Sequence, residues 1–359
     1  MHRPIRRSAA KPVRALLGAV AAALLIVALS AAPAFACGGL IGPNGAVNLL
    51  KTTTLAGYHD GAEHYVTAFQ FAGGGGAFGS LTPLPGIPSS VEKGGDWTLQ
   101  RLVRETEPER LFDVTAQAAA SAGSAEELMK VRIDALDITV LRGGPAEVGT
   151  WATAHGFRLP PDAPEVLDFY AARSPIFLAA VFDADAAAQR GQAVGDGTPV
   201  HVTIPTDNPW VPLRILALGK TATDRVDASV YLLTDRTPAL LPVPTGDNGL
   251  SLGHSAAATQ SLLDDLRGDR GMGWVPTSAW LTKVDIDAAA PQLGFDLAID
   301  ASGAGAPSRL MAGLDLPGAT VLPDRTADTL RLVLGLAFAI GGVGGILLLV
   351  RYRPPLSMA

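Results

Sequence analysis

Residues 332–350 contain 19 consecutive residues without a charge, and this run constrains the chain more than any other feature. A helix of that length spans about 29 Å, close to the roughly 30 Å hydrocarbon thickness of a bilayer. Arg351 and Arg353 follow the run, and the positive-inside rule places such arginines in the cytoplasm. We therefore predict a transmembrane helix over residues 331–351, a cytoplasmic tail over residues 352–359 and a large domain outside the membrane. The Gly-xxx-Gly spacing of Gly341 and Gly345 also permits a helix-mediated homodimer.

The N-terminus has the three regions of a secretory signal peptide. Residues 1–14 are basic, residues 15–30 are apolar, and Ala34-Phe35-Ala36 supplies the small residues that a signal peptidase accepts. We predict a signal peptide over residues 1–36; the alternative is an uncleaved anchor. Cys37, the single cysteine of the chain, would then begin the mature protein. The sequence leaves open whether Cys37 is lipidated or free, and it excludes an intrachain disulfide.

The charge of the chain is unevenly distributed. Eight of its 28 basic residues lie in residues 1–36 and 331–359, which hold no acidic residue, so residues 37–330 have 20 basic and 34 acidic residues and a net charge of −14. Such a domain repels phosphate backbones, and nucleic acid is excluded as a partner.

Alternating apolar residues and turn signals predict an α+β fold with a mainly antiparallel sheet and a few short helices. The predicted extracytoplasmic domain covers residues 37–300, and the segment 301–330, rich in Gly, Ala, Ser and Pro, is predicted to be a flexible stalk. Strands are predicted over residues 47–58, 64–71, 79–85 (at an edge), 131–141, 176–182, 200–204, 213–218, 228–234, 279–287 and 295–299. Helices are predicted over residues 97–107, 148–155, 164–172 and 255–266.

Several segments in this order resemble the bacterial domain-of-unknown-function family 2330. They include Ala36-Cys37-Gly38-Gly39, Leu81-Thr82-Pro83-Leu84-Pro85, Trp151, Gly156-Phe157, Leu159-Pro160, Phe169-Tyr170, Thr206-Asp207-Asn208-Pro209, Val211-Pro212-Leu213-Arg214-Ile215 and Trp280-Leu281-Thr282-Lys283. The resemblance covers residues 36–290. It implies an exported, membrane-anchored protein, and it implies no activity, cofactor or catalytic residue.

Two glycine-rich motifs suggest chemistry but lack an essential residue. Gly253-His254-Ser255 resembles the nucleophile elbow of serine hydrolases, yet no histidine follows His254 to act as the base; we expect Ser255 to cap the following helix instead. The segment from Gly74 to Ser80 has the frame of a phosphate-binding loop without its lysine.

Histidines and aspartates supply the remaining candidate ligands. His59 and His64 flank the turn at Asp60-Gly61 and would need a third ligand to bind zinc or copper. His155 and His201 are interpreted as isolated structural residues. The acidic pairs Asp183/Asp185, Asp264-Asp265 and Asp285/Asp287 suggest a calcium site or a glycosidase, and Asp285 and Asp287 are expected on one face of a strand.

These observations assign no catalytic, cofactor-binding or metal-binding residue. They favour a non-enzymatic envelope module that binds a protein or glycan, presented through exposed tryptophans such as Trp97, Trp210 or Trp274. The alternative is an extracytoplasmic hydrolase that uses carboxylates gathered by the fold.

Overall fold

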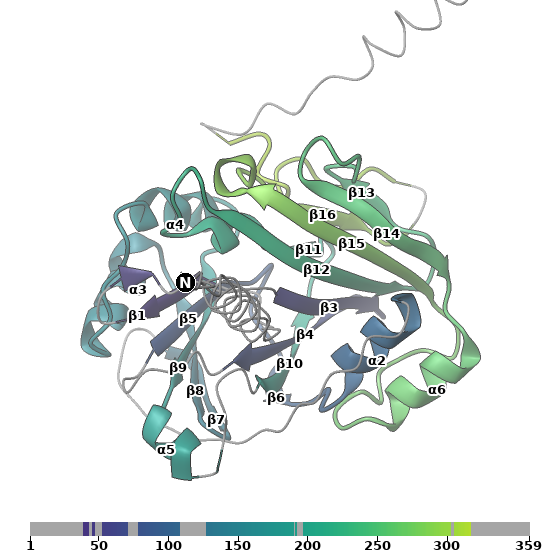
Figure 1. Cartoon of the computed structure of the whole chain (residues 1–359), viewed down its shortest axis with the longest axis horizontal. Helices are drawn as coiled ribbons and strands as arrows, with labels where there is room; N and C mark the ends of the chain where they lie inside the picture. The colour runs from purple at the N-terminus through teal and green to yellow at the C-terminus, as the bar shows by residue number, and fades with distance from the viewer. Residues whose placement is uncertain are drawn as a thin grey trace, which may run out of the picture. The chain divides into compact units, whose positions relative to one another are not determined.

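The computed structural model describes residues 39–42, 45–46, 52–70, 78–107, 127–189, 191, 197–302 and 305–316 (Figure 1). The predicted signal peptide, transmembrane helix, cytoplasmic tail and Cys37 lie outside these residues. No helix within the described ranges is long and apolar enough to cross a membrane.

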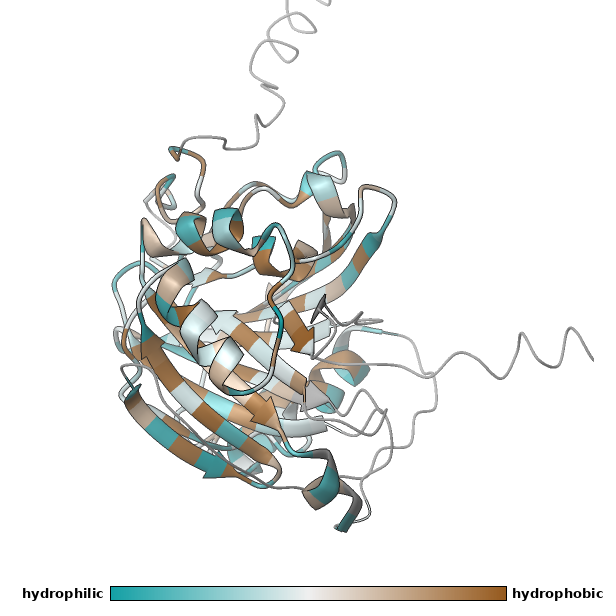
Figure 2. Cartoon of the chain, turned by 90° about the vertical axis from the view of Figure 1, so that its left-hand side faces the viewer, coloured by the Kyte–Doolittle hydropathy of each residue, from teal (hydrophilic) through white to brown (hydrophobic). Residues whose placement is uncertain are grey.

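The first sheet has six strands in the order β2-β1-β5-β9-β8-β7, and all neighbouring strands are antiparallel. Its strands are β1 (Gly39–Gly42), β2 (Gly45–Ala46), β5 (Phe78–Pro83), β7 (Glu127–Ile133), β8 (Leu136–Arg142) and β9 (Ile176–Phe182). β9 is an apolar run that is buried along its whole length, which is typical of a strand enclosed on both faces. Hydrophilic and hydrophobic residues alternate along several outer strands (Figure 2), as expected for strands with one solvated face.

The second sheet has seven strands in the order β14-β15-β12-β3-β4-β10-β6. These are β3 (Thr52–His59), β4 (Ala62–Gln70), β6 (Ser90–Lys93), β10 (Gly197–Pro205), β12 (Arg225–Thr234), β14 (Leu250–Ala257) and β15 (Trp280–Ala289). Neighbours are antiparallel except β3 and β12, which run parallel. Asp60 and Gly61 join β3 to β4 with φ angles of 49° and 75°, the conformation that a two-residue hairpin turn requires.

Helices cover one face of this second sheet (Figure 1). α2 (Thr98–Thr106) and α6 (Gln260–Gly268) place their leucines in a single apolar core with side chains from β3, β4, β12 and β15. Thr259 begins α6, because its hydroxyl accepts a hydrogen bond from the Leu262 N–H. The remaining helices are α3 (Pro145–Ala154), α4 (Ala163–Ala171) and α5 (Ala184–Gln189).

A small third sheet, in the order β11-β16-β13, is fixed by a buried ion pair. Its strands are β11 (Trp210–Val211), β13 (Ala239–Leu241) and β16 (Leu297–Asp300). The Asp296 carboxylate pairs with the Arg173 guanidinium, and both side chains are fully buried. Asp296 also accepts hydrogen bonds from the Leu213 and Arg214 N–H groups at 2.7 and 2.9 Å. These bonds hold the start of η1 (Arg214–Ala217), a 3-10 helix.

The α+β class with dominant antiparallel sheets is confirmed, and several details of the predicted elements are wrong. In place of the strand predicted over residues 213–218, residues Arg214–Ala217 form η1, because Asp296 caps their first turn. Residues 127–142 form a hairpin, β7–β8, instead of one strand, because Asp134 adopts a φ of 57° and turns the chain. β5 lies between β1 and β9 rather than at an edge; Pro83 is its last residue, where a missing N–H interrupts the ladder least.

Two further observations concern the ends of the described domain. Residues 250–257 form β14, so the helix predicted from residue 255 begins only at Gln260. Residues 305–316, inside the predicted stalk, contact the domain: Arg173 donates a hydrogen bond to the Met311 carbonyl, and the Asp296 N–H donates to the Ala312 carbonyl. Residues 317–330 lie outside the described residues.

Candidate functional site

Two histidines from neighbouring strands form a buried pair. In the register of β4 and β10, His64 lies opposite Thr203 and His201 lies opposite Val66, so both imidazoles occupy the helix-covered face. Nδ1 of His64 lies 3.0 Å from Nε2 of His201, and one ring therefore donates a hydrogen bond to the other. The interpretation of His201 as isolated is wrong.

Trp274 covers this histidine pair. Its ring stacks on His64 with a centroid separation of 4.0 Å and an interplanar angle of 2°. A glycine is required beneath it, because a Cβ at Gly57 would overlap the indole ring. Burial lowers the pKa of His64 to about 3 and also lowers the pKa of His201. The pair is thus neutral near pH 7, and it is a packed element of the core rather than an open ligand set.

The metal site considered for His59 and His64 does not form among the described residues, where no group of three or more His, Cys, Asp or Glu side chains is placed to hold an ion. His59 pairs with Asp235 at 2.8 Å. Glu63, next to His64 in sequence, points to the opposite face of β4 and is completely buried. Burial raises the pKa of Glu63 to about 8, and its carboxyl accepts one hydrogen bond, from the Trp210 N–H at 3.3 Å.

A second polar cluster lies where α2 ends over β12 and β15. The ammonium group of Lys283 pairs with Glu107 at 2.6 Å and with Asp285 at 3.1 Å. The Ser229 hydroxyl donates to the same oxygen of Asp285 at 2.8 Å. This cluster fastens the C-terminus of α2 to the sheet. One signal in the sequence could have indicated this cluster: Lys283 and Asp285 lie two residues apart in a predicted strand and therefore on one face.

The acidic pairs that suggested calcium or a glycosidase are largely engaged in other interactions. Asp285 and Asp287 share one face of β15, as expected, but each has a cationic partner: Lys283 for Asp285 and Arg225 for Asp287. Asp264 pairs with Arg267, and Asp265 pairs with Arg101. Asp183 accepts hydrogen bonds from the N–H groups of Asp185 and Ala186 at the start of α5.

The two glycine-rich motifs have structural roles where they are described. Ser255 lies within β14 and accepts a hydrogen bond from the Trp280 indole N–H at 2.9 Å, so the prediction that it caps a helix is wrong. Gly253 and His254 belong to the same strand, with a register shift between Leu252 and His254. Residues 71–77 of the phosphate-loop motif lie outside the described residues, and Gly79 and Ser80 belong to β5.

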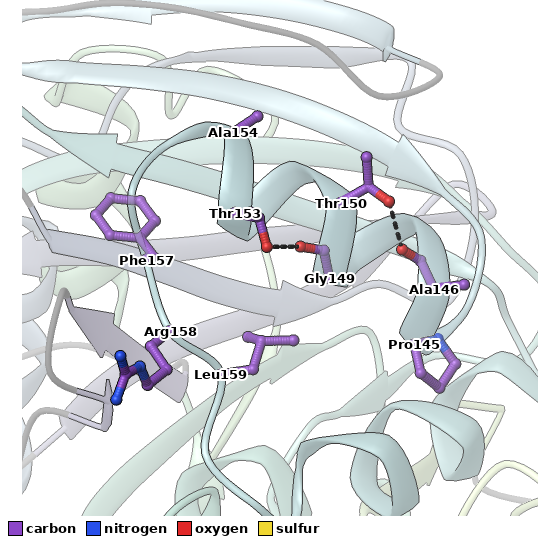
Figure 3. A pocket seen from close by; sticks show the side chains of 9 residues that line it. All are labelled: Pro145, Ala146, Gly149, Thr150, Thr153, Ala154, Phe157, Arg158 and Leu159. Carbon is purple, nitrogen blue, oxygen red and sulfur yellow. Dashed lines mark hydrogen bonds between the residues drawn. The ribbon is translucent and has the colours of Figure 1, made fainter.

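A surface depression of about 890 Å³ lies against α3 (Figure 3). Its lining consists of Pro145, Ala146, Gly149, Thr150, Thr153, Ala154, Phe157, Arg158 and Leu159. The hydroxyls of Thr150 and Thr153 donate hydrogen bonds to carbonyls of α3 itself at 2.9 Å. The depression therefore offers mainly apolar surface and one arginine. This small-residue lining specifies no ligand.

The outer strand β14 is exposed along most of its length. Ser251, Leu252, Gly253, Ser255 and Ala257 are exposed to solvent, and the side chain of Leu252 is 54% exposed. No residue of β14 is charged and none is proline, although outer strands usually carry such residues to prevent pairing with other chains.

The tryptophans predicted to form an exposed binding surface have different environments. Trp97 is 40% exposed, whereas Trp210 is fully buried and stacks on Tyr170. Trp274 is partly buried on His64. The aromatic residue beside β14 is instead Trp280, which sequence reasoning missed. It is partly exposed and directly opposite Ala257.

The architecture is that of a sheet-dominated α+β domain built from three sheets and short helices. The chain belongs to the domain-of-unknown-function family 2330, described as an uncharacterized protein conserved in bacteria, which matches residues 31–240. A comparison with curated proteins gave no match.

Among solved structures, the domain is similar to baculovirus P35 and to a mutated baculovirus P35 after caspase cleavage, at 8% and 7% sequence identity. Both comparisons have a TM-score of 0.37 and cover 69% of this chain, with 96% and 99% of the respective P35 chains. A likeness at this level carries no inference about function.

Proposed function

We propose that this protein is a membrane-anchored binding module of the bacterial envelope, with its large domain outside the membrane and its short C-terminal tail in the cytoplasm. The apolar run at residues 332–350, the arginines that follow it and the signal-peptide pattern at residues 1–36 support this placement. The module is held by one C-terminal helix and binds another envelope protein without transforming it.

The single observation that carries the binding role is the open edge of β14. β14 has eight residues, and its alternate residues direct their backbone N–H and C=O groups away from β15, to an edge that no other described strand pairs with. The strand contains no charged residue and no proline. Such an edge pairs readily with an extended segment of another chain. A partner that occupies this edge completes the hydrogen bonding of the sheet.

The second candidate function is an extracytoplasmic hydrolase. One observation favours it: the carboxylates of Glu107 and Asp285 converge on Lys283, with the Ser229 hydroxyl beside Asp285. The ion pairs of these carboxylates favour a structural role, because a carboxylate held by a cation is a weaker proton acceptor.

Photocrosslinking in intact cells tests the binding role. A photoreactive amino acid replaces Ser255 on β14, and in a matched variant it replaces Leu310, which is 42% exposed in the 305–316 segment. We expect one membrane-associated adduct of constant mass from position 255 and none from position 310. The role is refuted if the full-length protein in micelles hydrolyses a peptide, ester or glycan substrate and loses that activity on Asp285→Asn.

The placement in the membrane is tested separately by adding protease to intact cells. We expect the large domain to be digested and an epitope at residue 359 to be protected. Digestion of the epitope with the domain intact would show the opposite orientation.

A further inference from the structure

Among the described residues, the outer edge of β14 is more available for pairing with a further strand than the edges of the other outer strands. β6 and β7, which end the two larger sheets on one side, lie next to each other, and Lys93 of β6 pairs with Asp134 in the turn that follows β7. β2, β11 and β13 are only two or three residues long. β14, with eight residues, is therefore the longest outer strand among the described residues and the one best suited to accept a further strand.

The two faces of the sheet beside β14 differ in chemistry. Leu252, Ser255 and Ala257 point to one face, where Ser255 holds the partly exposed Trp280 ring. This face offers apolar contacts to a chain that lies along the edge. Because side chains of a strand alternate between faces, every second residue of an added strand would meet Leu252 or Trp280.

The opposite face is acidic. In the register of β12 and β15, this face together with the C-terminal end of α2 carries more carboxylates than cations. The groups are Asp227, Asp285, Asp287 and Glu107 against Arg225 and Lys283. The remaining residues of an added strand would approach this excess of negative charge.

Asp285 extends from β15 toward the open edge. One of its carboxylate oxygens holds Ser229 and Lys283. The other lies directly over Gly253 of β14, where a Cβ would overlap it. The glycine therefore keeps a negatively charged oxygen within reach of a long basic side chain that crosses β14.

These features point to one occupant. A second copy of this chain would bring the same acidic face and the same net charge of −14 over residues 37–330, so like charges oppose self-pairing through β14. We propose that β14 binds an extended segment of another protein as an additional strand, with apolar side chains on the Leu252 face and lysine or arginine side chains on the Asp285 face. This proposal rests on the binding role above and specifies its partner.

The probe is a fluorescent decapeptide of alternating valine and lysine, titrated into the full-length protein in micelles and followed by fluorescence anisotropy. Two comparison peptides are a valine–glutamate version and a valine–lysine version that is N-methylated at every second residue. We expect the glutamate peptide to bind at least about tenfold more weakly at low salt. N-methylation on the paired edge should abolish binding, because it removes the backbone donors. Added salt should reduce the difference in affinity between the valine–lysine and valine–glutamate peptides, because it screens the charges.

Protein variants locate the site. We expect Leu252→Lys to weaken binding of the valine–lysine peptide about tenfold or more, while the matched variant Leu310→Lys leaves it unchanged. Asp285→Asn should reduce the preference of the protein for the lysine peptide over the glutamate peptide. Asp315→Asn makes the same charge change at a residue paired with Arg309, and it should leave this preference unchanged. The proposal is overturned if Leu252→Lys binds the valine–lysine peptide as wild type does, or if wild type binds the lysine and glutamate peptides with equal affinity. It is also overturned if the protein forms concentration-dependent dimers that Leu252→Lys dissociates.

The outcomes separate this inference from the proposed function. If photocrosslinking identifies a partner but the β14 variants bind peptides normally, the strand-addition mechanism is wrong and the binding role stands. If position 255 gives no adduct and the peptides do not bind, both fail.

Discussion

The buried histidine pair makes the protein sensitive to acid. In the folded state the pKa of His64 is about 3, against an ordinary value of 6.5. Below pH 6.5 the His64 ring therefore binds a proton in the unfolded chain and not in the folded chain, and its contribution to the free energy of unfolding falls as the pH falls. The loss from His64 is at most about 2 kcal/mol between pH 7 and pH 5. His201, whose pKa is also lowered by burial, acts in the same direction, although the cross-strand neighbour Glu92 favours its charged form.

The variant His64→Gln isolates this effect. Glutamine cannot take up a proton, so the difference in stability between wild type and variant should shrink as the pH falls from 7 to 5. At pH 7 we expect the variant to be less stable by about 1–3 kcal/mol, because it loses the Trp274 stacking and the bond to His201. Glu63 titrates in the opposite sense, but it is present in both proteins and cancels in the comparison.

The assay is urea unfolding of the full-length protein in micelles at pH 7, 6 and 5, monitored by tryptophan fluorescence. His155→Gln is the matched control: the His155 ring contacts the Trp151 ring at a centroid separation of 4.6 Å, away from the pair, so the acid response that arises from the His64–His201 pair should persist in this variant. A stability difference between wild type and His64→Gln that stays constant over this pH range would refute the reasoning.

Three further predictions concern the core. Gly57→Ala should destabilise the fold by about 1–3 kcal/mol in urea unfolding, because its methyl group overlaps the Trp274 ring; an unchanged midpoint would contradict this contact. Asp296→Asn should cost about 3–5 kcal/mol, since it leaves the Arg173 charge buried without a partner; a loss below about 1 kcal/mol by the same measurement would show that the pair is solvated. Glu63→Gln should remove one contribution to the pH dependence: with a folded pKa of about 8 against 4.5 unfolded, the stability that Glu63 contributes falls by up to about 1.4 kcal/mol per unit as the pH rises through this range, opposite in sign to the effect of the histidine pair. A stability difference between wild type and variant that stays constant between pH 5 and pH 7 would contradict this contribution.

Local sequence patterns correctly predicted the elements whose conformation is determined by neighbouring residues. The apolar run at residues 176–182 gave β9 with its observed bounds, and the Asp60-Gly61 turn gave the β3–β4 hairpin. Residues 213–218 were mispredicted because their conformation depends on Asp296, which is more than 80 residues away in the chain. An apolar segment of six residues carries no local signal that distinguishes a strand from a 3-10 turn.

The candidate sites depend still more on contacts between residues that are far apart in the chain. His64 and His201 are 137 residues apart, and only the register of β4 against β10 brings them together. β14 was mispredicted for a different reason: both of its faces are solvated, so it lacks the alternation that identifies a half-buried strand. The solvent exposure of both faces prevented the prediction of β14 from the sequence, and the same exposure makes the strand accessible to a partner.

β16 is the central strand of its sheet, although it is the last strand that the structure describes. Within the described residues β11 and β13 pair only through β16, and Asp296, just before it, caps η1 some 80 residues earlier. A nascent chain that has been synthesised only to residue 290 therefore lacks the strand with which β11 and β13 pair and the carboxylate that caps η1. The third sheet can therefore form only after β16 has been synthesised, and a truncation at residue 240, the end of the family match, would remove β14, β15 and β16 together.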